Sequence, residues 1–320
     1  MRDAIGRFQE QFTWQPSIEH AEALRPHKNV IVCGMGGSHM GPTLVRDFGN
    51  HPEVIIHRDY GLPKLPQHLM SDALVILSSH SGNTEEVLDS GREALARGLP
   101  TAAVTTGGKL AEFAREHALA HVVFPYMNLQ PRVATALSML SIAALLRDEA
   151  LDKSIRAAGA SIDAVALEAE GTQIAERLHG KVPVVYGSTA NTIITAMWKI
   201  KMNETGKVPA FYNVFPEMNH NELCGFDVVE STRKNSGNMH VIMLRDLEDH
   251  PRIQKRMQAA ADVFEEKGIP VENVQLVGTG LQKAFRAVTL ADWTALTLAQ
   301  HYGVPDEDVP VVEDFKRRIA

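Results

Sequence analysis

Short apolar runs alternate with helical patterns along most of this 320-residue chain. Five of these runs predict β-strands in the first half, at residues 29–34, 54–57, 74–77, 100–105 and 120–124. Helices are predicted after the first and the third of them, at about residues 38–47 and 85–97. Because strands that alternate with helices form parallel sheets covered on both faces, the sequence predicts an α/β protein with doubly wound parallel sheets.

The second half of the chain repeats the plan of the first half. Aligning the two halves matches Gly34 with Gly187, Val75 with Val241, and Gly98 with Gly268. We therefore expect two tandem copies of one α/β unit, an internal repeat that divides the chain into residues 1–151, with an N-terminal helical segment, and residues 152–320. A helix over residues 139–151 is expected to bridge the two copies.

Composition limits the partners and the compartment of the protein. A net charge of −7 argues against nucleic acid as a partner and leaves a small anionic substrate open. The two cysteines, Cys33 and Cys224, cannot form a disulfide framework, so we expect reduced thiols in a cytoplasmic protein. No apolar stretch reaches the roughly 18 residues of a membrane span, and the N-terminus has no signal-peptide core, so we expect no membrane association.

Two turns rich in glycine and hydroxyl groups follow predicted strands and open predicted helices. Their glycine and hydroxyl residues are Gly36, Gly37, Ser38, Ser79, Ser81 and Thr84. Open α/β sheets bind ligands at the carboxyl ends of their strands, and helix N-termini offer N–H donors to anions. The two turns together therefore predict a binding site for a phosphate monoester, whereas a single such turn would more simply cap its helix.

The second copy lacks an equivalent of the second turn. In place of Ser-Ser-His-Ser-Gly-Asn-Thr-Glu-Glu it carries Leu-Arg-Asp-Leu-Glu-Asp-His-Pro-Arg, from Leu244 to Arg252, which is unsuited to holding an anion. We therefore expect the first copy to keep the ligand site and the second copy to serve as scaffold and as a wall of the site.

Other known binding motifs are incomplete in this chain. The stretch from Gly34 to Gly41 lacks the third glycine of a dinucleotide fingerprint, and Lys109 precedes Leu110 rather than the Ser or Thr of a nucleotide P-loop. The fourteen histidines form no H-x-H or H-E-x-x-H pattern, and no pair of nearby cysteines occurs. We expect no metal site and no cofactor.

Three charged residues are candidates for catalysis. Glu204 closes a predicted helix, where the helix dipole disfavours a carboxylate, and this makes it a candidate base. The alternative is a solvated glutamate at a helix end. His220 lies between two asparagines in a polar loop, and Arg132 follows a Gln-Pro turn. Taken alone, each of these two would more often be a surface residue.

Together these stretches resemble the bifunctional phosphoglucose/phosphomannose isomerases, a family built from two flavodoxin-like sugar-isomerase (SIS) domains. The resemblance runs from about Val30 to the C-terminus. It rests on the Gly-Gly-Ser turn, on SSHSGNTEE, and on the stretches GGKLAE from Gly107, QPR ending at Arg132, NETGKVPAF from Asn203 and PEMNHNE from Pro216. The hydroxyl motif alone marks a phosphosugar-binding domain, whereas the last two stretches point to the isomerase.

The resemblance implies conversion of glucose 6-phosphate, and of mannose 6-phosphate, to fructose 6-phosphate through a cis-enediol. The glycines and hydroxyls of the two turns would hold the phosphate group. Glu204 would move a proton between C1 and C2, and Arg132 would stabilise the enediolate. His220 and Lys316 would assist ring opening, with His220 contributed by the neighbouring subunit of a homodimer.

Two other functions stay open. A non-catalytic phosphosugar-binding regulator would keep the hydroxyl groups but would not need all four charged residues together. An aminosugar-phosphate isomerase is expected less, because no N-terminal glutaminase with a leading cysteine is present. Val309 also stands where the resemblance would place a threonine before Pro310, and this missing hydroxyl bears on the use of mannose 6-phosphate.

Overall fold

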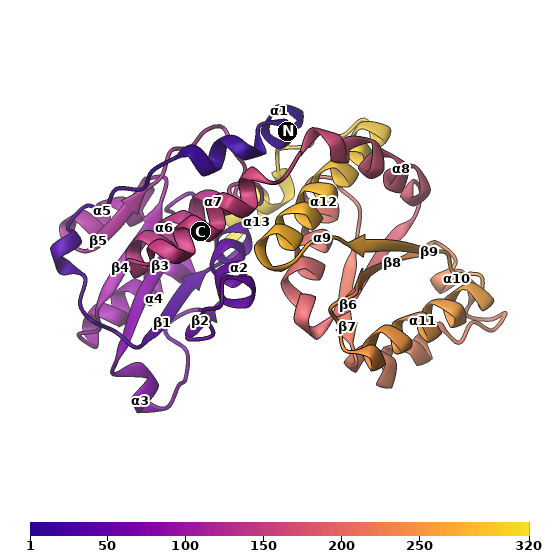
Figure 1. Ribbon diagram of the computed structural model, residues 1–320, viewed down its shortest axis with the longest axis horizontal. Helices are drawn as coiled ribbons and strands as arrows, with labels where there is room; N and C mark the ends of the chain where they lie inside the picture. Colours follow the sequence, from indigo (N-terminus) through magenta and orange to yellow (C-terminus); the bar gives the residue numbers. More distant parts are fainter. Residues whose placement is uncertain (320) are drawn as a thin grey trace. The chain divides into compact units, whose positions relative to one another are not determined.

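The computed structural model describes residues 1–319 and divides by its internal contacts into two compact units (Figure 1). The first unit comprises Arg7–Ile162 and Gly280–Gln282. The second unit comprises Met1–Gly6, Asp163–Thr279 and the chain from Lys283 onward. Each unit is built around its own parallel sheet, as the sequence predicts.

The first unit has a five-stranded sheet with the strand order β2-β1-β3-β4-β5. Its strands are β1 (Asn29–Gly34), β2 (Val54–His57), β3 (Ala73–Ser79), β4 (Thr101–Thr105) and β5 (Ala120–Val123). Its α-helices are α2 (Met40–Phe48), α3 (Gln67–Met70), α4 (Glu85–Ala96), α5 (Gly108–Glu116), α6 (Thr135–Leu146) and α7 (Glu149–Ala160), with 3-10 turns η1 (Phe8–Thr13), η2 (Ala21–Ala23) and η3 (Gly36–His39). All five strands predicted for this half are confirmed.

Helices cover both faces of the first sheet. On one face α4 and α5 pack together, and their Val87 and Leu110 share a core with Val75 and Leu77 of β3. On the other face α6 contacts α2, β4 and β5. Because side chains alternate between the faces of a strand, every residue of β3 is buried. This confirms the doubly wound arrangement.

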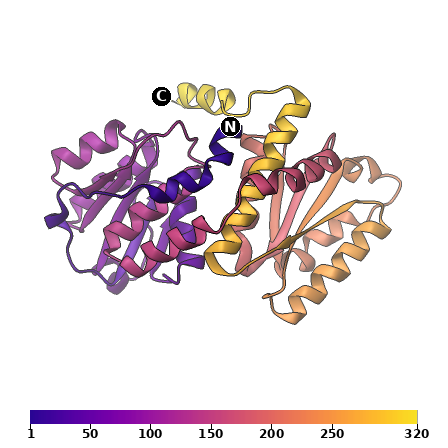
Figure 2. The same cartoon turned by 45° about the horizontal axis from the view of Figure 1, so that its top comes forward.

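The second unit has a four-stranded sheet with the strand order β7-β6-β8-β9. Its strands are β6 (Val182–Ser188), β7 (Phe211–Phe215), β8 (Met239–Asp246) and β9 (Val271–Leu276). Its α-helices are α1 (Arg2–Gly6), α8 (Glu168–Leu178), α9 (Thr192–Glu204), α10 (Arg233–Ser236), α11 (Pro251–Glu266), α12 (Gly280–Tyr302) and α13 (Pro310–Ile319), with 3-10 turns η4 (Val165–Leu167), η5 (Thr189–Asn191), η6 (Glu217–His220) and η7 (Glu222–Phe226). Figures 1 and 2 show α11 and α12 on opposite sides of this sheet.

The strand register confirms the internal repeat. The residue three positions before Gly34 pairs with Val75 on the neighbouring strand. In the second sheet, the residue three positions before Gly187 pairs with Val241. The two pairs of residues matched in the sequence therefore occupy the same places in their sheets, and α11 is the counterpart of α4.

The third matched pair, Gly98 and Gly268, closes the two equivalent helices in the same way. The φ angles are 69° at Gly98 and 77° at Gly268, a left-handed conformation that glycine adopts readily. In both places the N–H of the following residue donates to the carbonyl five residues before it, from Leu99 to Ala94 and from Ile269 to Phe264. The repeat thus extends to the backbone hydrogen bonds of the helix ends.

The division between the units falls later than the expected boundary between residues 151 and 152. The predicted bridging helix over residues 139–151 is in fact broken at Arg147, whose φ is 55°, and α7 starts two residues later. Asp148 caps α7 by accepting the N–H of Leu151 at 2.8 Å. Both α6 and α7 pack in the first unit, so the chain divides between Ile162 and Asp163.

The two cysteines are free thiols in different surroundings. Cys33 is buried in β1 and Cys224 is exposed in η7. Burial raises the pKa of the Cys33 thiol to about 12, so this group stays protonated at neutral pH. Within residues 1–319, no helix is both long and apolar enough to cross a membrane.

Candidate active site

The two hydroxyl-rich turns lie side by side at the carboxyl edge of the first sheet. One follows β1 and the other follows β3, which are neighbouring strands. The Ser38 hydroxyl accepts the backbone N–H of His80 at 2.9 Å, and the Ser78 hydroxyl donates to the Ser38 carbonyl at 2.9 Å. These two hydrogen bonds join the turns into one surface.

The hydroxyl of Thr84 does not cap α4. Thr84 has the extended backbone of an N-cap residue, but its side chain makes no capping hydrogen bond. Its Oγ1 lies instead 2.8 Å from the Oγ of Ser79. The first N–H groups of α4 therefore point to the front of the helix without an acceptor from the N-cap side chain, which favours an anion there.

Gly82 fixes the shape of the second turn. Its φ of 69° is left-handed, and a Cβ at this position would lie 1.8 Å from the carbonyl oxygen of Gly107. The Gly82 N–H donates to the Ser79 carbonyl at 3.2 Å, and the Gly82 carbonyl accepts the N–H of Leu110 at 2.9 Å. The second turn thus packs against the start of α5, and this contact explains why the Gly107-Gly108-Lys109-Leu110 stretch occurs together with the hydroxyl motif.

Arg132 reaches the first turn from the loop between β5 and α6. Its side chain is 1% exposed, so it is not the surface charge that its sequence context alone would suggest. A Cβ on Gly37 would lie 2.6 Å from the carbonyl carbon of Pro131 and 2.8 Å from the backbone nitrogen of Arg132. Only glycine permits this approach, so Gly37 sets the position of the Arg132 backbone.

His80 is a site residue that the sequence did not single out. Its ring packs on Phe124 and Tyr126, and burial lowers its pKa to about 4, so the imidazole is neutral at physiological pH. The Nε2 of His80 and the hydroxyl of Ser138 are buried and have no hydrogen-bond partner within residues 1–319. Both residues line a cavity of about 10 Å³, together with Ser38. The sequence signal was a histidine inside the hydroxyl motif itself.

In the second unit, the edge that corresponds to the two turns is filled by charged groups of the protein. Asp246 ends β8 and is 5% exposed. It accepts hydrogen bonds from Asn191 at 2.9 Å and from Lys283 at 2.6 Å, and Lys283 also donates to Glu248 at 2.6 Å. Within residues 1–319 this edge therefore has no counterpart of the free hydroxyl groups of the first unit, which agrees with the asymmetry expected from the sequence.

Glu204 is the last residue of α9, as predicted, and is half-buried. The residues after it form a tight helix end. Lys207, with a φ of 56°, donates from Nζ to the carbonyls of Glu204 and Asp308, and Asn203 donates to the Val208 carbonyl at 2.9 Å. These contacts fix the end of α9 and tie it to the segment that leads into α13.

His220 ends η6 and is exposed. The loop around it is anchored by Glu222, whose carboxylate accepts hydrogen bonds from the Tyr186 hydroxyl at 2.6 Å and from the Asn213 amide. Burial and the Glu222 carboxylate raise the pKa of Tyr186 well above its ordinary value, so the phenol stays protonated and keeps donating. Glu222 therefore holds the loop in place and presents His220 at the surface.

Lys316 lies on α13, which has no buried residue within the described part of the chain. Its Nζ contacts the Glu313 carboxylate at 2.7 Å on the same helix. Lys316, Glu204 and His220 thus all belong to the second unit. The first unit holds the remaining predicted residues, Gly36, Gly37, Ser38, Ser79, Ser81, Thr84 and Arg132.

Two parallel α/β units, one of which carries paired hydroxyl turns at its strand ends, define a phosphosugar-isomerase (SIS) type of protein. Residues 167–319 match the family model described as bacterial phospho-glucose isomerase C-terminal SIS domain. Among solved structures, a hypothetical protein from Thermus thermophilus has a similar fold. Its TM-score is 0.72 at 18% identity, and the match covers 99% of this chain and 89% of that chain.

Curated relatives narrow this class to one family. The chain is 32% identical to a bifunctional phosphoglucose/phosphomannose isomerase from Aquifex aeolicus, over 98% of this chain and 96% of the relative. It is 33% identical to a protein of the same name from Caldicellulosiruptor bescii, over 91% of this chain and 89% of the relative. The chain belongs to the family of bifunctional phosphoglucose/phosphomannose isomerases.

Proposed function

We propose that the protein is an aldose–ketose isomerase that interconverts glucose 6-phosphate, and mannose 6-phosphate, with fructose 6-phosphate. The observation that carries this proposal is the joining of two hydroxyl turns at one sheet edge, with Arg132 buried against the first of them, in a chain of this family. A phosphosugar isomerase needs groups that bind the phosphate, and it needs charged groups at the reacting carbons. This chain contains candidates for both.

The phosphate grip would consist of hydroxyls and backbone N–H groups. Ser38, Ser79, Ser81 and Thr84 supply the hydroxyl donors, and Gly36 and Gly37 let the backbone approach the ligand. The N-terminus of α4 adds roughly half a positive charge. A compact dianion held in this way leaves the sugar carbons free to reach catalytic groups.

Glu204 would act as the base. It removes the proton from C2 of the open-chain aldose to form a cis-enediol, and it returns that proton to C1 to give the ketose. Glucose 6-phosphate and mannose 6-phosphate differ only in configuration at C2, which is planar in the enediol, so both give the same intermediate. Arg132 would stabilise the charge that develops on the enediolate oxygen, a contribution of about 3 kcal/mol for one such donor.

Ring opening precedes this proton transfer and requires its own acid and base. We assign this step to His220 and Lys316. The exposure of His220 on an anchored loop supports a further part of the proposal, namely that it acts in the site of the neighbouring subunit of a homodimer. The free cysteines support a cytoplasmic location for this dimer.

The second candidate function is a non-catalytic phosphosugar-binding regulator. The tight end of α9 argues against it, because Lys207 and Asn203 fix the position of Glu204 at some conformational cost. A sensor that only grips the phosphate has no need of a glutamate held in this way.

The test is turnover of glucose 6-phosphate and, separately, of mannose 6-phosphate to fructose 6-phosphate, with a chelator present. We expect turnover of both substrates. Glu204→Gln should lower kcat by at least about 10²-fold while the sugar phosphate still binds. As a matched control, Glu230→Gln, at an exposed position of the same unit, should keep wild-type turnover. An active Glu204→Gln variant would refute the base assignment, and binding without turnover in the wild type would favour the regulator.

A further inference from the structure

The second unit lacks a counterpart of α5 within the described residues. In the first unit α5 follows β4 and packs beside α4, where Leu110 is fully buried and Phe113 lies against Gly91. In the second unit β9 leads directly to α12, which lies on the side of the sheet away from α11. The surface of β9 beside α11 is therefore left without the apolar helix that covers β4.

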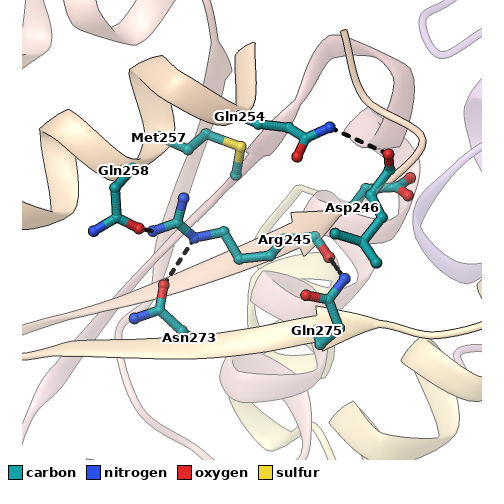
Figure 3. A pocket seen from close by; sticks show the side chains of 8 residues that line it. Arg245, Asp246, Gln254, Met257, Gln258, Asn273 and Gln275 are labelled. Carbon is teal, nitrogen blue, oxygen red and sulfur yellow. Dashed lines mark hydrogen bonds between the residues drawn. The ribbon is translucent and has the colours of Figure 1, made fainter. Parts of the chain in front are cut away.

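A pocket of about 360 Å³ occupies this place (Figure 3). Its lining comes from β8, the turn after it, β9 and α11: Arg245 and Asp246 from β8, Leu247 from the turn, Asn273 and Gln275 from β9, and Gln254, Met257 and Gln258 from α11. The Asp246 carboxylate is paired with the Lys283 ammonium at 2.6 Å and accepts a hydrogen bond from Asn191, so its negative charge is compensated. The volume falls in the range of small-molecule sites, which begins at about 300 Å³.

Arg245 is the only positively charged side chain among the described residues that line this pocket. Its Nε donates to the Asn273 amide oxygen at 2.8 Å, and its Nη2 donates to the Gln258 amide oxygen at 3.0 Å (Figure 3). Both partners are neutral. Asp262, whose charge acts on Arg245, accepts a hydrogen bond from the amide nitrogen of Gln258 at 2.7 Å.

The guanidinium is thus oriented but not neutralised. No carboxylate within residues 1–319 forms a salt bridge with Arg245, and partial burial lowers its pKa because the charged form has lost water. A half-buried cation without a counter-ion favours binding of an oxyanion, and guanidinium geometry suits phosphate and carboxylate oxygens.

Two glutamines offer acceptors opposite the guanidinium. The amide nitrogen of Gln254 donates to the Leu247 carbonyl at 3.2 Å and to the Asp249 carbonyl at 2.8 Å, and that of Gln275 donates to the Arg245 carbonyl at 2.9 Å. These bonds turn both amide oxygens toward the pocket, as Figure 3 shows. Amide oxygens in this position accept hydrogen bonds from hydroxyl groups.

We propose that this pocket binds a small polyhydroxylated anion, in which a phosphate or carboxylate group contacts Arg245 and neighbouring hydroxyls donate to Gln254 and Gln275. The site is built entirely from the second unit. It shares no lining residue with the hydroxyl turns or with Glu204, and it does not depend on the proposed isomerase activity.

The thioether of Met257 provides a local probe, because it lines the pocket. The intact protein, with its methionine methyl groups labelled with ¹³C, is titrated with glycerol 3-phosphate and, in a second arm, with glycerate. The Met257 resonance is assigned from a Met257→Leu sample. We expect this resonance to shift and saturate with at least one of the two ligands, and the arm that saturates first identifies the preferred oxyanion.

Asn273→Asp is the decisive variant. Aspartate has the same shape as asparagine. The substitution costs no hydrogen bond, because the Asn273 Nδ2 that it removes has no acceptor within residues 1–319. The new carboxylate, however, neutralises the Arg245 guanidinium. We expect at least a tenfold loss of affinity. Lys255→Gln is the matched control: it removes an exposed charge from α11, the helix that lines the pocket, and should bind the ligand within twofold of the wild type. Arg245→Lys, which keeps the charge without both amide bonds, should bind more weakly than the wild type. A Met257 resonance that neither ligand moves, or equal affinity in Asn273→Asp and the wild type, overturns the proposal.

Discussion

The contact between Gly37 and the Pro131–Arg132 backbone offers a test of the candidate site that does not alter any functional side chain. Gly37→Ala adds one methyl group that would lie 2.6 to 2.8 Å from backbone atoms of the neighbouring loop. Ordinary van der Waals contact begins at 3.4 Å. Backbone atoms cannot rotate away, so the loop carrying Arg132 has to move by somewhat less than about 1 Å, a displacement that can lower rates by about 10²-fold.

This displacement sets the expected magnitude. A 10²-fold loss corresponds to about 2.7 kcal/mol of activation free energy, close to the contribution of about 3 kcal/mol expected from a single donor to a developing oxyanion. We therefore expect kcat to fall by about 30- to 100-fold. Overpacking should also lower the free energy of unfolding by about 1–3 kcal/mol.

The assay is conversion of glucose 6-phosphate to fructose 6-phosphate at a temperature where the variant is folded, with kcat and KM measured separately. Gly6→Ala is the matched control, because a Cβ at Gly6 has no neighbour within 4 Å. It should keep wild-type kcat. If Gly37→Ala is folded and keeps the wild-type kcat, then the approach of the loop to Gly37 does not position Arg132 for catalysis.

Three other single substitutions test separate parts of the molecule. Tyr186→Phe removes the 2.6 Å hydrogen bond to Glu222 and should lower the free energy of unfolding by about 1–2 kcal/mol in urea titrations; an unchanged midpoint and slope would contradict this. Val309→Thr should raise kcat/KM for mannose 6-phosphate relative to glucose 6-phosphate, and an unchanged ratio would show that this hydroxyl does not govern the choice of epimer. Because burial lowers the pKa of His80 from 6.5 to about 4, its neutral form stabilises the fold above pH 6.5. Stability should therefore fall between pH 6.5 and 4, less steeply in His80→Asn, as measured by unfolding at several pH values.

The fold was predictable because its determinants are local. Each buried strand is a run of apolar residues, and the repeat of a strand, a helix and a helix-ending glycine appears twice in the sequence. Glycines such as Gly98 and Gly268 mark helix ends because few other residues adopt their left-handed φ. The break between α6 and α7 was missed because Arg147 takes that conformation without such a marker.

The candidate site was predictable in its residues but not in its contacts. The hydroxyl turns could be found because strand ends and helix starts locate them at one edge of a sheet. The burial of Arg132 depends on a loop that meets the turns only in the folded chain, as does that of the His80 Nε2, which has no hydrogen-bond partner among residues 1–319. Their sequence neighbours carry no periodic pattern, so no local signal reported these contacts.

The two copies also show how one structural difference produces a new surface chemistry. Where α5 is present, the residues that it covers are small or apolar, such as Gly91 and Ala103. In the second unit, where the described chain has no such helix, β9 carries Asn273 and Gln275, whose exposed polar side chains are solvated by water. Solubility alone, however, would be served equally well by lysines and glutamates with mixed charges. A single guanidinium held by neutral amides is a more specific arrangement than solvation requires, and this is why the pocket is better explained by a ligand than by exposure alone.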